Sequence, residues 1–231
     1  MQVLAATVNA VDKAIASGEH YLSPRELPAV CGIEGVGLLG DGRRVYFGMP
    51  VGPHGSMAER TLIDPRRSMP VPDGLDDAVA ATLGNAGWAA WLPLSWRAAM
   101  RPGEKVLILG ATGVVGRLAV QAAALLGAGR VVAAGRDPGA LSEVGELGAD
   151  ATVNLAAESD LTEAFLEHMG GPVDVIVDYT WGAPAAAALR AGATGVRLVQ
   201  VGDRAGQQLT VPAQLMRSLG ASIHGFMPIH A

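Results

Sequence analysis

The stretch Lys105–Arg117, with the sequence KVLILGATGVVGR, decides the fold of this chain. Its apolar start is followed by three equally spaced glycines, Gly110, Gly113 and Gly116. An Ala- and Leu-rich segment, Leu118–Leu126, comes directly afterwards. A short apolar run that stops at a glycine and leads into a longer apolar segment predicts a strand, a tight turn and a helix.

Glycines at these places have a specific use. The first lets the chain reverse, the second lets the backbone approach a pyrophosphate, and the third lets the helix pack against the strand. A diphosphate then lies on the free N–H groups of the helix N-terminus, where the helix dipole favours negative charge. A plain strand–helix turn without a ligand is the alternative, and GxxGxxG is not the commoner GxGxxG spacing. A second strand at Arg130–Ala134 favours dinucleotide binding. The predicted contacts are Gly110, Ala111, Thr112, Gly113, Val114, Val115 and Gly116.

The end of the second strand indicates which dinucleotide binds. An acid about 20 residues past the glycine turn reads the ribose hydroxyls of NAD. Here the strand ends in Gly135 and Arg136, without an acid. A carboxylate would repel a 2′-phosphate, whereas a guanidinium binds one with two parallel hydrogen bonds. We therefore predict NADP(H) as cofactor, with Gly135 and Arg136 in contact with it. A solvated surface arginine is the alternative, and the neighbouring Asp137 weakens the phosphate interpretation.

Composition narrows the class of protein. The 231 residues are 50% hydrophobic and 17% charged, enough for one large or two modest domains. The net charge of -5 and the lack of a basic run argue against nucleic acid or a membrane as main partner, and leave a small-molecule substrate. Cys31 is the single cysteine, so an internal disulfide is impossible and a reducing, cytoplasmic compartment is expected. We expect neither a signal peptide nor a membrane span.

The two halves of the chain differ in pattern. Residues 1–75 combine turn signals with one short helix and several short strands, predicted at Asp12–Ser17 and at Val3–Val8, Val36–Leu39, Arg44–Phe47 and Glu59–Ile63. Asp76–Trp96 is predicted to be helical. From there strands and helices alternate, which predicts a parallel sheet covered on both faces. The predicted strands are Val106–Leu109, Arg130–Ala134, Ala151–Asn154, Val173–Asp178, Val196–Val201 and Ser222–Phe226. The predicted helices are Val114–Leu126, Gly139–Leu147, Leu161–His168, Pro184–Arg190 and Pro212–Ser218.

Few residues suggest other chemistry. With one Cys and five His, and without HExxH or a paired Cys spacing, a zinc site is poorly supported. GxSxG does not occur, and neither lysine lies four residues after a tyrosine, so nucleophilic hydrolysis and a Tyr–Lys proton relay are unsupported. His20, beside Tyr21, is a candidate for a place near the substrate.

Several short motifs, taken together, resemble one family. They are VNAVD at 8–12, GIEGVG at 32–37, GRRV at 42–45, RPGE leading into GATGVVG, and GRD at 135–137. In this order they resemble VNxxD, GxExxG, GDRV and the cofactor motifs of the zinc-independent medium-chain dehydrogenase/reductases, in the quinone oxidoreductase and enoyl reductase branch. The resemblance runs along nearly all of the chain.

The resemblance implies an α/β protein with a GroES-like β domain at 1–97, including a connecting helix, and a Rossmann domain at 98–231. It implies hydride transfer from NADPH to a quinone or activated alkene without zinc, since zinc-bearing relatives hold a Cys near the Asn9 position and a His at the Ile33 position. Asn9 would lie near the nicotinamide ribose, and Val201 and Gly202 would line the nicotinamide. A homodimer through the edge strand Ser222–Phe226 is also implied.

Departures from the family pattern leave alternatives open. The β domain is expected to be incomplete, without its usual first strands and C-terminal return. Ala14, Ala89 and Gly139 replace a tyrosine, a threonine and a lysine found in relatives. Cofactor binding is therefore better supported than turnover, and a catalytically impaired NADPH-binding module, acting as a sensor or partner subunit, is the alternative to a reductase. A structural protein that has lost its ligand is a third hypothesis, which the glycines and Arg136 disfavour.

Overall fold

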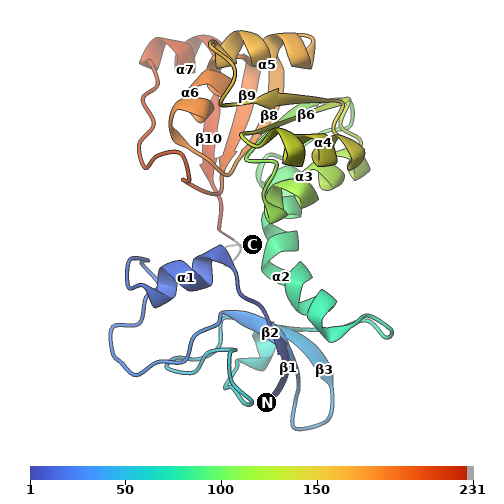
Figure 1. Ribbon diagram of the computed structural model, residues 1–231, viewed down its shortest axis with the longest axis vertical. Coiled ribbons are helices and arrows are strands. Elements are labelled where there is room, and N and C mark those ends of the chain that lie inside the picture. Colours follow the sequence, from blue (N-terminus) through green and yellow to red (C-terminus); the bar gives the residue numbers. More distant parts are fainter. Residues whose placement is uncertain (228–231) are drawn as a thin grey trace. The chain divides into compact units, whose positions relative to one another are not determined.

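The computed structural model describes residues 1–227 and divides the chain into two compact units, Met1–Gly87 and Trp88–Ala231. The last four residues of the predicted second domain, 98–231, lie outside the described residues. One unit holds a four-stranded antiparallel sheet and the other a six-stranded parallel sheet (Figure 1). This confirms the predicted α/β class. Within residues 1–227, the helices are all too short or too polar to cross a membrane.

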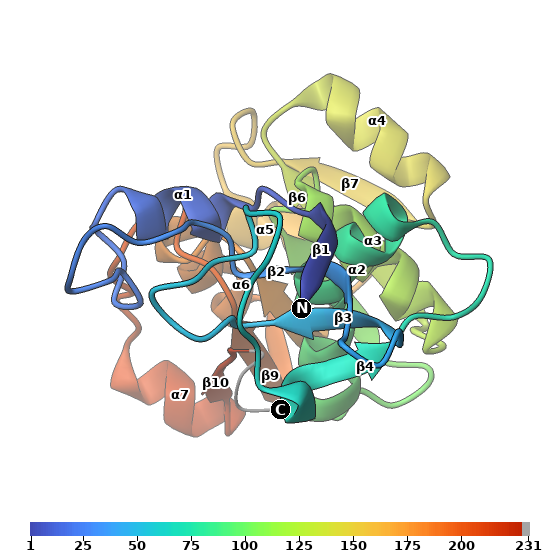
Figure 2. The same ribbon diagram turned by 90° about the horizontal axis from the view of Figure 1, so that it is seen from below.

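The antiparallel sheet of the first unit has the order β1-β2-β3-β4 (Figure 2). Its strands are β1 (Gln2–Ala6), β2 (Glu34–Leu38), β3 (Arg44–Gly48) and β4 (Ser68–Pro70), with the 3₁₀ turn η1 (Pro65–Arg67) before β4. Three predicted strands are thus present, with bounds shifted by one to two residues. Val36 and Phe47 are both fully buried, and the pairing register places their side chains on opposite faces of this sheet.

The fourth strand was predicted in the wrong place. Glu59–Ile63 is not a strand: it makes an isolated bridge between Arg60 and Gln2. One bond from the Val3 N–H to the Glu59 oxygen and two bonds between Met1 and Thr61 flank this bridge. The segment was predicted as a short strand because turn signals flank it, but its pairing with the N-terminal strand does not extend beyond these bonds. The actual β4 is three residues long and ends in a proline, so it has too few positions to show an alternating pattern.

Two helices belong to the part of the chain before the parallel sheet. α1 (Ala10–Ala16) matches the predicted Asp12–Ser17 and is followed by Gly18, whose φ of 81° ends it. α2 (Asp77–Leu92) continues into the π-helical turn η2 (Pro93–Arg97), so the predicted helix Asp76–Trp96 is two pieces. Pro93 has no N–H to donate to the preceding turn, which explains the change of winding at this residue.

In the second unit the strand order is β10-β9-β8-β5-β6-β7. The strands are β5 (Lys105–Leu109), β6 (Arg130–Gly135), β7 (Ala151–Asn154), β8 (Val173–Asp178), β9 (Gly192–Gln200) and β10 (Ser222–Gly225). The helices are α3 (Val114–Leu125), α4 (Pro138–Glu146), α5 (Leu161–Met169), α6 (Gly182–Arg190) and α7 (Ala213–Leu219). Every predicted strand and helix of this region is present, and β9 begins four residues earlier than predicted. From β5 the chain continues through β6 and β7 on one side of the sheet and through β8, β9 and β10 on the other. In such sheets, ligands bind at the carboxyl ends of the strands beside the point where the order reverses, here between β5 and β8.

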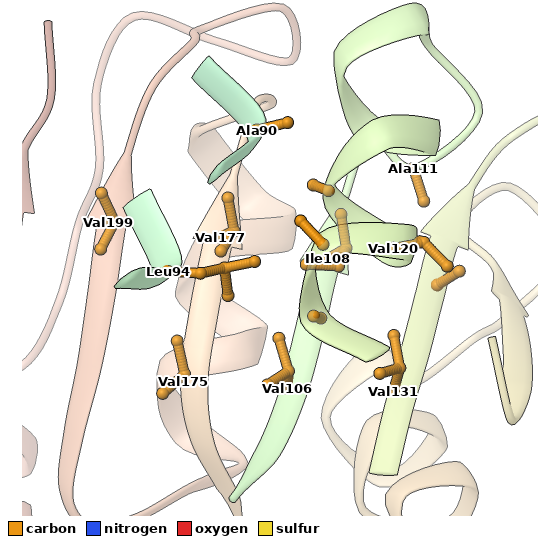
Figure 3. Close-up of a cluster of buried hydrophobic side chains, with 14 of the residues drawn as sticks. Ala90, Leu94, Val106, Ile108, Ala111, Val120, Val131, Val175, Val177 and Val199 are labelled. Carbon is orange, nitrogen blue, oxygen red and sulfur yellow. The ribbon is translucent and has the colours of Figure 1, made fainter. Parts of the chain in front are cut away.

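Both faces of the parallel sheet are covered by apolar side chains. On one face, Val106 and Ile108 of β5 pack with Val120 of α3, and Figure 3 shows them between strands β6 and β8. On the other face, Leu107 and Leu109 pack with residues of α5 and α6. A strand buried on both sides needs apolar residues at every position, which is the run that precedes Gly110.

Candidate functional site

The glycine turn between β5 and α3 has the tight geometry expected from its sequence. Gly110 has a φ of 82°, and the N–H groups of Gly110 and Ala111 both donate to the carbonyl oxygen of Ala134, at 2.9 Å each. A Cβ atom added to Gly116 would lie 2.3 Å from the Gly110 oxygen, so this position has no room for a side chain. A Cβ on Gly113 would meet nothing closer than the same oxygen at 3.6 Å. Gly116 therefore permits close packing, whereas Gly113 leaves open space.

The first turn of α3 presents unused hydrogen-bond donors beside this open space. In the described chain the main-chain N–H groups of Val114, Val115 and Gly116 make no hydrogen bond. The N-cap residue, Gly113, has no side chain to cover them, and the first turn contains no acidic residue. Free N–H groups and the positive end of a 12-residue helix together attract an anion.

The end of β6 lies directly against the glycine turn. A Cβ on Gly135 would be 2.5 Å from Cγ2 of Thr112, so the absence of a side chain lets the two segments touch. Arg136 follows as an exposed residue and makes no ion pair with any described residue. The carboxylate of Asp137 accepts the N–H of Ala140 at 2.7 Å and caps α4. Asp137 is thus engaged with α4, and the charge of Arg136 remains available.

A second arginine at this edge was missed in the sequence. Nε of Arg117 donates to the carbonyl oxygen of Thr112 at 3.2 Å, and its terminal nitrogen pairs with Oε2 of Glu143 at 2.6 Å. Arg117 thereby links the glycine turn to α4, the helix that follows Arg136. Its position directly after the third glycine was the available signal.

The carboxyl ends of β8 and β9 lie beside the glycine turn and form the rest of the candidate site. The N–H groups of Val201 and Gly202 donate to the carbonyl oxygen of Asp178 at 2.8 and 3.2 Å. A Cβ on Gly202 would lie 2.7 Å from the Tyr179 oxygen, and one on Gly110 would lie 3.2 Å from Cβ of Tyr179. The structure therefore brings the predicted residues at 110–116, 135 and 201–202 to one edge of the sheet, with the unpredicted residue Tyr179 between two of these segments.

The turn between β8 and α6 is held by a buried carboxyl group. Oδ1 of Asp178 accepts the N–H and Oγ1 of Thr180 at 2.8 and 2.9 Å, and the N–H of Trp181 at 2.9 Å. Oδ2 has no hydrogen-bond partner, and the residue is fully buried. Burial raises the pKa of Asp178, against the opposite effect of the three hydrogen bonds. Trp181 has a φ of 60°, a strained conformation for a residue with a side chain.

Asn9, the other predicted site residue with a family counterpart, lies in the first unit. Its Nδ2 donates to Oε1 of Glu34 at 2.6 Å and to Oγ1 of Thr7 at 2.9 Å. Its main-chain N–H donates to Oδ2 of Asp12 at 2.7 Å, as part of a capping box at the start of α1. A carboxylate only accepts hydrogen bonds, so Glu34 fixes the direction of the Asn9 amide.

Glu34 is the centre of a wider network. Its Oε2 accepts the hydroxyl of Tyr46 at 2.5 Å and the N–H of Asn85 at 2.7 Å, and the side chain is almost fully buried. Burial and the negative charge of Glu34 raise the pKa of Tyr46. A Cβ on Gly84 would overlap the Tyr46 ring at 2.0 Å, so glycine at this position lets α2 approach β3.

His20 forms its contacts within the loop after α1. Its Nδ1 accepts the N–H of Leu22 at 3.1 Å, and its ring lies 4.1 Å from that of Tyr21. A bond accepted at Nδ1 places the proton of the neutral ring on Nε2. These contacts give His20 a role in this turn and do not test its predicted place near the substrate.

Neither Asn9 nor Ile33 carries one of the Cys, His or carboxylate side chains that commonly bind zinc. The Nδ2 group of Asn9 is a donor committed to Glu34, and the Ile33 side chain has no lone pair. Across residues 1–227, no three His, Cys, Asp or Glu side chains are grouped so that they could hold a metal ion.

The chain is similar in sequence and in structure to known oxidoreductases. The family model of the zinc-binding dehydrogenases matches residues 114–227. Quinone oxidoreductase-like protein 2 of Bos taurus is 29% identical over 229 residues, covering 94% of this chain. Prostaglandin reductase-3 of Bos taurus is 31% identical over 244 residues, covering 96% of this chain. The chain spans 64% and 62% of the length of these two relatives.

A solved structure matches the whole fold. The quinone oxidoreductase of Thermus thermophilus, determined also in complex with NADPH, superposes with a TM-score of 0.82 at 30% identity. The match covers 98% of this chain and 71% of the Thermus chain.

Proposed function

The chain belongs to the medium-chain dehydrogenase/reductase family of oxidoreductases, and from this membership we propose that it is an NADPH-dependent reductase of quinones or activated alkenes that works without zinc. The chemistry that NADPH supplies when bound is hydride transfer. The proposal extends to the acceptor because a quinone oxidoreductase and a prostaglandin reductase are among the relatives.

The observation that carries this proposal is the set of free N–H groups at the start of α3, together with an arginine, after the neighbouring strand, that makes no ion pair with a described residue. The open position at Gly113 and the free N–H groups of the first turn of α3 suit a diphosphate. Arg136, without a competing carboxylate, suits a 2′-phosphate. We assign these groups to the two phosphate sites of NADPH.

The remaining assignments follow the same proposal. Val201 and Gly202 line the nicotinamide end, and Asn9 contacts the nicotinamide ribose. Reduction of the acceptor needs a proton as well as a hydride. This proton comes from water, since none of the candidate residues is a clear general acid. The proposal leaves zinc out, supported by the residue types of Asn9 and Ile33, which are not common zinc ligands.

Turnover and binding are measured together to test the proposal. NADPH oxidation is followed with a benzoquinone, a naphthoquinone, an enone and a simple aldehyde, with and without a chelator. Oxidation with a quinone or the enone, unaffected by the chelator, supports the proposal. Tight NADPH binding without turnover favours the alternative of a cofactor-binding module. Failure to bind NADPH overturns both.

A further inference from the structure

The turn at Asp178–Gly182 depends on one side chain. Three donors from Thr180 and Trp181 converge on Oδ1 of Asp178 within 2.9 Å. Such a convergence is the Asx-type turn that an aspartate forms with the residues that follow it. Both Trp181 and Gly182 have positive φ values, of 60° and 63°, so this backbone is costly for at least Trp181. The side chain of Asp178 stabilises a conformation that the chain disfavours.

The same residue also fixes the end of the next strand. The carbonyl oxygen of Asp178 accepts the N–H groups of Val201 and Gly202, and the N–H of Ala205 donates to the Thr180 oxygen at 2.6 Å. These hydrogen bonds join the β8–α6 turn to residues 201–205, the segment that follows β9. A change in the turn at Trp181 moves both segments.

This piece lies against the glycine turn. Cγ2 of Thr180 and Cβ of Tyr179 would each be 3.2 Å from a Cβ on Gly110, and Gly202 has no room for a side chain beside the Tyr179 oxygen. The hydroxyl of Tyr179 donates to the Ala89 oxygen at 2.8 Å, which anchors its other end. Gly110 and Gly202 thus leave little space beside Tyr179 and Thr180, and the N–H of Tyr179 donates to the Leu109 oxygen at 3.1 Å, so a shift of the β8–α6 turn would reach the glycine turn.

We propose that Asp178 is a positioning residue for the cofactor: through the β8–α6 turn it sets the place of Val201 and Gly202 relative to Gly110, and hence the nicotinamide relative to the diphosphate. This inference rests on the proposed function, because it takes this edge of the sheet as the NADPH site. Asp178 is fully buried and acts through other residues, without contact with the reacting atoms.

The test compares Asp178→Ala with Asp178→Asn, using NADPH and 2′,5′-ADP as separate probes in calorimetric titrations. An amide at this position keeps the Oδ1 acceptor and so rescues the turn, whereas alanine removes it. In Asp178→Ala we expect NADPH affinity to fall about tenfold, on the scale of one or two misaligned hydrogen bonds, and 2′,5′-ADP affinity to stay the same. With a quinone acceptor, kcat falls further than KM changes, by about 10- to 100-fold for a reacting group displaced by about 1 Å.

Asp160→Ala is the matched control, because Oδ1 of Asp160 caps α5 through two main-chain N–H groups in the same manner. It should leave both titrations unchanged. If Asp178→Ala does not fold, the double variant with Trp181→Gly replaces it, since glycine tolerates the positive φ without the carboxyl group, and partial recovery of NADPH affinity is then expected.

Three results would overturn the inference: unchanged NADPH affinity in Asp178→Ala, equal losses for NADPH and 2′,5′-ADP, or no rescue by asparagine. Failure of the unsubstituted chain to bind 2′,5′-ADP would instead contradict the proposed function, so the two failures are distinguishable.

Discussion

At the scale of single residues, Arg136 is expected to set the cofactor preference. In Arg136→Ala, NADPH affinity should fall about 10- to 150-fold, because a charge-assisted contact with the 2′-phosphate contributes about 1.5–3 kcal/mol. NADH affinity should not change. Titration of both cofactors measures the effect, and Arg190→Ala, an exposed arginine at the C-terminal end of α6, is the control. Equal affinity of the unsubstituted chain for the two cofactors would contradict this assignment.

Asp178 should make stability depend on pH. Its pKa is raised by burial above the ordinary value of 3.8, so the folded chain keeps a proton that the unfolded chain releases. Between the two pKa values the free energy of unfolding therefore falls as pH rises. Asp178→Asn does not titrate and retains the Oδ1 acceptor, so its stability relative to the unsubstituted chain should increase with pH across this window.

Urea unfolding of both proteins at a series of pH values, from acid to neutral, gives this difference. The buried Nδ2 group of the variant adds a cost that is the same at every pH and leaves the slope unaffected. A difference that stays constant, or that shrinks as pH rises, would show that burial does not raise the pKa of Asp178.

At the scale of elements, substitutions at two glycines of the glycine turn should have different effects. One should weaken cofactor binding, and the other should lower the stability of the fold. Gly113→Ala places a methyl group where the nearest atom is 3.6 Å away, so the chain should fold and lose NADPH affinity by more than about tenfold, because the methyl group occupies the phosphate's place. Gly116→Ala places a methyl group 2.3 Å from the Gly110 oxygen, and the forced shift should cost about 1–3 kcal/mol or more of stability.

Thermal unfolding and cofactor titration of the two variants provide the comparison. Gly145→Ala, in α4, adds a methyl group to open space and is the matched control. If Gly113→Ala bound NADPH normally, the open space beside the first turn of α3 would not be the diphosphate site.

Elements that follow a strong pattern could be predicted from the sequence. The strands of the parallel sheet are apolar throughout because both of their faces are buried, and glycines and prolines mark their ends. The antiparallel unit was harder, because its short strands rest on a few main-chain bonds. Glu59–Ile63, predicted as a strand, makes only an isolated bridge, and β4 pairs with β3 but is too short to show a pattern.

The candidate site also contains residues that could be predicted from the sequence and residues that could not. The glycine turn was predicted from the spacing of its glycines between a strand and a helix, and Gly135 from its place at the end of the second strand. The role of Asp178 was missed, although an aspartate at the end of a buried strand, followed by threonine, is a known turn signal. The positive φ of Trp181 could not be foreseen, because it arises from the contacts that hold the turn and runs against the residue's own preference.

At the scale of the whole molecule, we predict self-association through β10. This strand lies at the edge of the parallel sheet and pairs only with β9 among the described strands. It contains no lysine, glutamate or proline to discourage pairing, and Ile223 is 38% exposed. A dimer by light scattering after size exclusion is expected, and Ile223→Lys should convert it to a monomer. A monodisperse monomer of the unsubstituted chain would reject edge pairing.

The network around Glu34 has a consequence for the order of events during synthesis. Its four hydrogen bonds come from Thr7, Asn9, Tyr46 and Asn85, so the last donor belongs to α2. As the chain leaves the ribosome from its N-terminus, the carboxylate is incompletely satisfied until residue 85 has emerged. A nascent chain halted before that point lacks the Asn85 N–H that Oε2 of Glu34 accepts in the complete unit. The hydrogen bonds of Glu34 are therefore complete only after α2 has been synthesised as far as Asn85.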